Sequence, residues 1–150
     1  MSRRITLSVI AGALVLSGAG AFALAHAGDQ APSLAHSTAR YVAPDSGERG
    51  SFTFTTEVSA ASGVKNLKVL AWPENSALST QQPTVKEMAQ AESARCQSAG
   101  GDNARCVYTT PVTDAEAASS PRGTWHVAVL ATAEDGTTAL NTKAVDFTVG

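Results

Sequence analysis

The stretch of sequence that decides the fold is GTWHVAVLATAEDGT, residues 123–137. Apolar side chains occupy every second position from Trp125 to Ala131, and this alternation predicts a strand with one face in a core. The acidic, Gly-containing end of the stretch is typical of a hairpin turn. A second strand is therefore expected over residues 140–149, with Val145, Phe147 and Val149 facing inward.

The same pattern of short strands separated by turn-forming residues continues upstream. We predict further strands over residues 34–42, 51–58, 64–72 and 105–112. Thr84 and Glu87 have the spacing of a capping box, so a short helix is expected over 84–94, inserted between the third and fourth strands. No repeated strand–helix–strand units are present. The chain is thus predicted to be all-β: an antiparallel β-sandwich of about six to seven strands, with one inserted helix.

Residues 1–27 have the pattern of a secretory signal peptide. Arg3 and Arg4 precede an apolar segment over 5–24, and Ala25-His26-Ala27 forms a small-residue cleavage site. An uncleaved membrane anchor is the alternative, and the choice between the general and twin-arginine export routes stays open. We expect a secreted, extracellular protein with a flexible lead over 28–33 and a single domain over 34–150. After cleavage, no membrane association is expected.

Length and charge narrow the possible partners. The chain has 150 residues, 16% of them charged, and a net charge of −2. Loss of Arg3 and Arg4 with the signal peptide would make this −4, and no basic block remains. Nucleic acid and other polyanions are therefore not expected as partners, and the domain is expected to be a monomer.

Cys96 and Cys106 are the two cysteines of the chain. In an oxidising compartment they predict an intramolecular disulfide that stabilises by roughly 2–3 kcal/mol. Their spacing differs from that of C-x-x-C redox motifs, and the chain lacks the ligand spacing of a zinc site. We expect no metal and no cofactor.

Catalytic residues are not expected either. His126 would need an acid such as Asp146 or Asp135 and a nucleophile such as Ser119, but the chain has no G-x-S-x-G elbow. We interpret His126 as a surface histidine on a strand, and His36 as a solvated residue. Candidate calcium ligands occur at Asp45/Glu48, Asp102/Asn103 and Glu134/Asp135, and each pair is interpreted as an ordinary turn.

Two resemblances add to this interpretation. Residues 123–137, together with 62–70 and 145–149, resemble strands of bacterial immunoglobulin-like modules. The segment 37–149 also resembles an uncharacterised family of small secreted actinobacterial proteins of unknown function. The landmarks that carry this second resemblance are residues 39–44, residues 69–73, the cysteine pair and residues 123–125. It implies an immunoglobulin-like sandwich and supplies no catalytic or ligand residues.

The favoured function is a secreted, non-catalytic immunoglobulin-like binding module, whose partner is a protein or a cell-envelope polymer. Its specificity is expected to lie in the insertion 73–106. Trp72 is a candidate for an exposed binding surface, with burial in the core as the alternative. The second hypothesis is a small inhibitor of an extracellular protease or other enzyme, in which Arg95 or Arg105 enters an acidic pocket.

Overall fold

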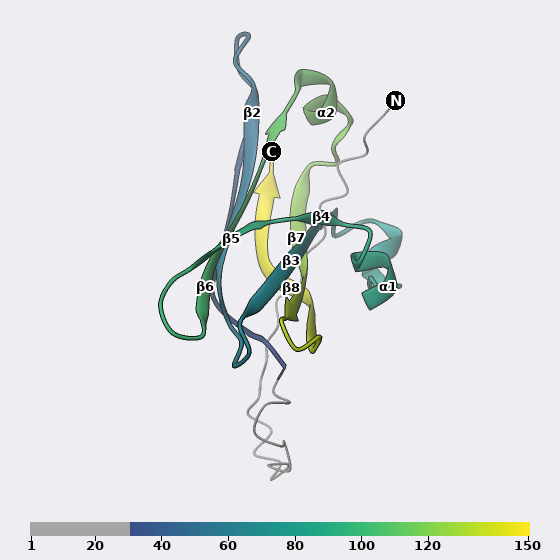
Figure 1. Ribbon diagram of the computed structural model, residues 1–150. Coiled ribbons are helices and arrows are strands. Elements are labelled where there is room, and N and C mark those ends of the chain that lie inside the picture. Colours follow the sequence, from purple (N-terminus) through teal and green to yellow (C-terminus); the bar gives the residue numbers. More distant parts are fainter. Residues whose placement is uncertain (1–30) are drawn as a thin grey trace.

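The computed structural model describes residues 31–150, which contain eight strands, and the alternating segments form the longer ones. These strands build two antiparallel four-stranded sheets that pack face to face, so the predicted all-β sandwich is confirmed (Figure 1). The proposed signal peptide, residues 1–27, lies outside the described residues. Within residues 31–150 the structure contains no helix with the length and hydropathy needed to cross a membrane.

The first sheet has the strand order β1-β2-β6-β5. Its strands are β1 (Ser33–Val42), β2 (Gly50–Ser59), β6 (Asn103–Val112) and β5 (Arg95–Ser98). The pairing of β1 with β2 is interrupted by a bulge between Ala35 and Thr38. His36 lies in this bulge with a φ of 54°.

The second sheet has the strand order β4-β3-β7-β8. Its strands are β4 (Glu92–Ser93), β3 (Val64–Pro73), β7 (Gly123–Ala133) and β8 (Thr138–Val149). The structure has two strands that the alternation did not predict. These are β4 and β5, which are too short to show an alternating pattern.

The core lies between the two sheets and contains the side chains that the alternation placed there. Trp125, Val127 and Val129 of β7 face Phe52 and Phe54 of β2, and all five are buried. Phe147 of β8 joins the two layers, because its ring centroid lies 4.7 Å from that of Phe52 and 5.9 Å from that of Trp125. The indole Nε1 of Trp125 donates to the carbonyl of Pro121 at 2.7 Å, so its one polar atom is satisfied.

The inserted helix is shorter than predicted. The capping box is present, since Thr84 accepts from the backbone N–H of Glu87 and the Glu87 carboxylate accepts from that of Thr84. However, α1 spans only Val85–Met88 rather than 84–94. The chain leaves the helix because Glu92–Ser93 pairs with β3 and the following residues pair with β6. A second capping box, formed by Thr113 and Glu116, begins α2 (Asp114–Ser119).

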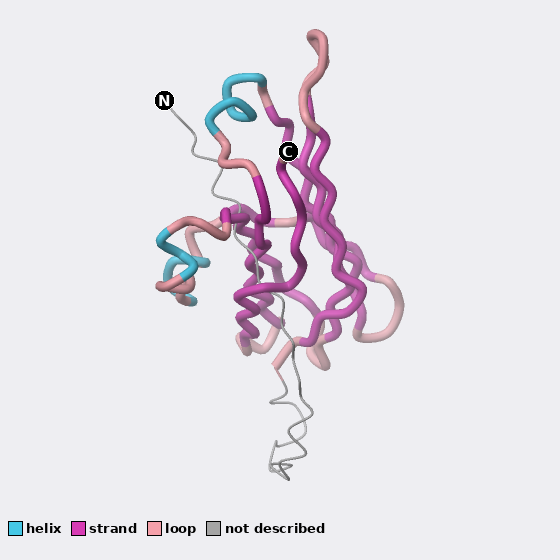
Figure 2. The backbone as a smooth tube through the Cα atoms, turned by 180° about the vertical axis from the view of Figure 1, so that it is seen from behind, coloured by secondary structure: helices cyan, strands magenta, loops and turns pink. Residues whose placement is uncertain are grey.

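The outer faces of the two sheets have different surroundings. Outside β3 and β7 lies the segment 74–91, which contains η1 (Ala77–Ser79) and α1 (Figures 1 and 2). Its Met88 is fully buried against Ala128 and Leu130, two outward-facing residues of β7 that are themselves buried. In the described part of the chain, no helix covers the outer face of the first sheet, whose outward side chains are exposed or half-buried. This face is therefore open to solvent.

Candidate functional site

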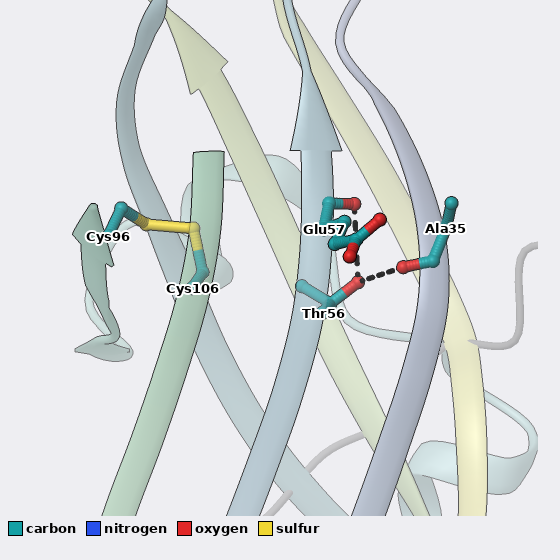
Figure 3. The surroundings of a disulfide bond; sticks show 5 residues. All are labelled: Ala35, Thr56, Glu57, Cys96 and Cys106. Atoms are coloured by element: carbon teal, nitrogen blue, oxygen red, sulfur yellow. Dashed lines mark hydrogen bonds between the residues drawn. A yellow bond between two sulfur atoms is a disulfide. The ribbon is translucent and has the colours of Figure 1, made fainter. Parts of the chain in front are cut away.

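The predicted disulfide between Cys96 and Cys106 is confirmed. The two cysteines lie directly opposite each other in the register of β5 and β6 (Figure 3). The strands are joined by a tight turn in which Gly100 and Gly101 have positive φ values of 99° and 59°, a conformation that glycine adopts without steric cost. Because Cys106 is fully buried and faces the core, its neighbours in the strand face outward.

This register brings Arg95 and Arg105 together on the outer face of the first sheet. Arg95 is opposite Val107 and Arg105 is opposite Gln97, so the two arginines are diagonal neighbours. Diagonal neighbours in an antiparallel pair lie about 7–8 Å apart. Both arginines are exposed, and neither forms an ion pair or side-chain hydrogen bond with any residue in 31–150. Spacing in sequence alone did not predict this pair.

A third arginine lies on the same face. Arg40 of β1 is opposite Thr53 of β2, which is in turn opposite Thr109 of β6. The hydroxyl oxygens of Thr53 and Thr109 lie 3.4 Å apart. We call this surface the arginine face, defined by Arg40, Arg95 and Arg105 together with Thr38, Thr53, Thr55 and Thr109.

The arginine face has one acidic side chain on its described strands, Glu57. Glu57 is opposite Arg105 in the register, but its carboxylate accepts a hydrogen bond from Nδ1 of His36 at 2.9 Å. His36 is 80% exposed at its side chain, as expected for a solvated residue. The two arginines of β5 and β6 therefore keep their hydrogen-bond donors free for a partner.

The segment that carries Arg95 crosses from one sheet to the other. Glu92 and Ser93 pair with β3 in the second sheet, and Arg95–Ser98 pairs with β6 in the first. The hydroxyl of Tyr108 on β6 donates to Glu92 at 3.4 Å, which adds a contact across this edge. Burial, and secondarily the charge of Glu92, raises the pKa of Tyr108 to about 12. Residues 92–106 are thus part of the sandwich itself, and the true insertion is 74–91 rather than 73–106.

Trp72 is buried, so of the two positions considered for it burial is correct and the exposed binding surface is wrong. It is 1% exposed, and its ring centroid lies 4.5 Å from that of His126. The ammonium of Lys143 lies 5.8 Å from the centre of the Trp72 ring. A ring enclosed in this way cannot act as a stacking platform for a sugar.

His126 is buried, contrary to the prediction of a surface position. It is 3% exposed, because the segment 74–91 covers the outer face of β7. Its Nδ1 donates to Asp146 at 2.7 Å, and its Nε2 lies 3.9 Å from the Glu74 carboxylate without a hydrogen-bond partner in residues 31–150. The sequence had indicated Asp146 as a possible orienting acid, but alternation could not show that another segment covers this face.

The His126–Asp146 pair is not joined by the nucleophile that was considered for it. The hydroxyl of Ser119 donates to the carbonyl of Glu116 in its own helix, at 3.1 Å. Asp135, the other acid considered, accepts from the backbone and hydroxyl of Thr137. These two hydrogen bonds lower the pKa of Asp135. The three residues of the hypothetical triad are therefore not brought together.

The candidate calcium ligands form hydrogen bonds within turns or to the neighbouring strand. Asp45 and Glu48 pair through their backbones, at 2.8 and 3.1 Å, and Asn103 accepts from the hydroxyl of Ser59. Asp135 is occupied by Thr137 as described above. Among residues 31–150, no three His, Cys, Asp or Glu side chains are grouped so that they could hold a metal ion.

A family model described as a family of unknown function (DUF5707) matches residues 34–131. The chain belongs to this family. The DUF5707 match extends from β1 into β7 and includes the disulfide and all three arginines of the arginine face. No curated protein and no solved structure matches the chain.

Proposed function

We propose that this protein is a secreted, non-catalytic immunoglobulin-like module that binds a protein or a cell-envelope polymer through the arginine face. The observation that carries the proposal is the difference between the two outer sheet faces. One is covered by the segment 74–91, and the other is open and presents three arginines. Arginine is enriched at binding surfaces, where its planar group pairs with carboxylates and phosphates.

The strand order supports an immunoglobulin-like topology. Lettered in chain order, β1, β2, β5 and β6 correspond to the A, B, D and E strands of an immunoglobulin constant-type domain, and β3, β7 and β8 to C, F and G. The short β4 is an additional strand beside C. Proteins with this architecture have many functions, so the functional argument rests on the arginine face and not on the topology.

Two features support secretion. Residues 1–27 have the composition of a signal peptide, and the chain contains a disulfide, which persists mainly in oxidising compartments. A bacterial cell envelope is then the first place in which a partner would be met.

The alternative, an enzyme inhibitor, is less well supported by the geometry. Inhibition through an acidic pocket requires a basic side chain on a protruding loop. Arg95 and Arg105 instead lie on strands within a sheet face, and the turn between β5 and β6, residues 99–102, contains no basic residue.

A pull-down tests the proposal. Residues 28–150, with the disulfide intact, are incubated with the producing organism's envelope fraction and culture supernatant, and bound material is identified by mass spectrometry. We expect retention of an envelope component, reduced when Arg95 and Arg105 are both replaced by alanine. Retention of an extracellular enzyme that loses activity would instead favour the inhibitor. If nothing is retained from either fraction, the binding module is refuted.

A further inference from the structure

We infer that the arginine face recognises a phosphodiester-linked polyol or sugar polymer of the cell envelope. This inference rests on the proposed function and specifies the chemistry of its partner. Arg95 and Arg105 are diagonal neighbours with free donors on one flat surface. Two guanidinium groups at this separation can converge on one phosphate group, whose unesterified oxygens accept hydrogen bonds from both.

The spacing across the sheet favours an extended ligand. Arg40 on β1 is separated from Arg95 on β5 by three strand-to-strand intervals, which is about 14 Å. Threonine hydroxyls occupy most of the positions between them, in the rows Thr53–Thr109 and Thr38–Thr55, and Val107 lies directly beside Arg95. A polymer with recurring phosphates would contact arginines at both sides of the sheet, and its hydroxyl groups would meet the threonines.

The charge of the arginine face is complementary to such a polymer, although the net charge of the whole chain had not favoured a polyanion as a partner. Its three arginines and Glu57 give a net charge of +2, while the whole chain has −2. The neighbouring acids Asp45, Glu48 and Asp102 lie in the hairpin turns at the two ends of the sheet. A local positive surface on an acidic protein attracts an anion at short range and does not create the broad basic field of a nucleic-acid-binding protein.

On the described strands of the arginine face, no aromatic side chain points outward. This argues against single-stranded nucleic acid as the ligand. Proteins that bind single strands stack bases on exposed aromatic rings. Here Phe52 and Phe54 face the core, as do the half-buried Tyr41 and Tyr108, which pack against it. Threonine hydroxyls suit a polyol or sugar backbone better than they suit bases.

The test is a binding titration of residues 28–150 against four probes. Poly(glycerol phosphate) is the phosphodiester polymer, polygalacturonate carries carboxylates, dextran is neutral, and an oligothymidine supplies phosphates with bases. We expect binding to poly(glycerol phosphate) that weakens as salt is added, because added ions screen exposed charges. The double variant R95A/R105A should bind it at least about tenfold more weakly.

A matched control separates a local effect from a change in net charge. K65A/R122A also removes two exposed positive charges, but Lys65 lies on β3 and Arg122 immediately precedes β7, both away from the arginine face. It should bind as the unmodified protein does. Equal weakening by both double variants would overturn the assignment of the site.

The outcomes also separate this inference from the proposed function. If the envelope retains the protein but R95A/R105A is retained equally well, the inference and the assignment of binding to the arginine face both fail, and the module binds through another surface. If polygalacturonate, dextran or oligothymidine binds as tightly as poly(glycerol phosphate) or more tightly, the ligand is not a phosphodiester-linked polyol or sugar polymer. If the envelope and supernatant retain nothing, the proposed function itself fails.

Discussion

Reduction of the Cys96–Cys106 disulfide should lower the free energy of unfolding by about 2.7 kcal/mol. The two cysteines are 10 residues apart. A loop of that size loses about 9 cal/mol/K of unfolded-chain entropy on cross-linking, which gives this value at 25 °C. The fully buried position of Cys106 makes reduction slow in the folded protein, so the reduced form is prepared by refolding under a thiol-free reductant.

Urea denaturation followed by tryptophan fluorescence provides the measurement. Trp72 and Trp125 are both buried, so their emission reports loss of the core. The variant C96A/C106A is the control, because its midpoint should not respond to reductant. A difference below about 1 kcal/mol between oxidised and reduced protein would refute the chain-entropy reasoning, since it would mean that unfolded-state restriction by this loop contributes little.

The same perturbation tests the arginine face. β5 contains four residues and is held by its pairing with β6 and by the disulfide. Reduction should therefore loosen Arg95 relative to Arg105 and weaken the proposed binding of poly(glycerol phosphate) under conditions where the domain remains folded. If reduced, folded protein binds with unchanged affinity, the backbone pairing alone is sufficient to hold the two arginines together.

Three further predictions concern the rest of the domain. Met88→Ala should lower the free energy of unfolding by about 2–5 kcal/mol in the same assay, because Met88 is fully buried. Val85→Ala on the exposed side of α1 should change it little, and equal losses would contradict the packing described. Asp146→Ala leaves both ring nitrogens of buried His126 without a partner in residues 31–150 and should cost about 1–3 kcal/mol. Asp146→Asn keeps an acceptor oxygen and should cost less, and a reversed order would refute the hydrogen bond. Folding raises the pKa of Tyr108 from 10.0 to about 12, chiefly by burial. Its contribution to stability is therefore complete below pH 10 and is lost as the pH rises through 12. An ultraviolet titration in which both described tyrosines ionised with a midpoint near pH 10 in the folded protein would contradict this.

Alternation in the sequence was sufficient to predict which side chains of the long strands face the core. Trp125, Val127 and Val129 are buried as expected, because a strand exposes successive side chains to opposite faces. Alternation does not show what lies against the second face. His126 was therefore assigned to the surface, although a segment more than 30 residues earlier in the chain covers it.

Local motifs predicted where helices begin but not where they end. The Thr84–Glu87 capping box is present as the sequence indicated. The end of α1 is determined by the pairing of residues 92–98 with strands of both sheets, which is a tertiary effect without a local signal. The proximity of Arg95 and Arg105 has the same origin, because it depends on the register of β5 with β6.

The position of the arginines on strands has a consequence for binding. A ligand that orders a flexible loop must offset the conformational entropy that the loop loses, which reduces affinity. Arg95 and Arg105 have backbones already fixed by the β5–β6 pairing and by the disulfide between them, so only their side chains are ordered on binding. This argues that the crossing segment 92–98 serves both the fold and the surface. It joins the two sheets, and it places Arg95 beside Arg105 on the open face of the first sheet.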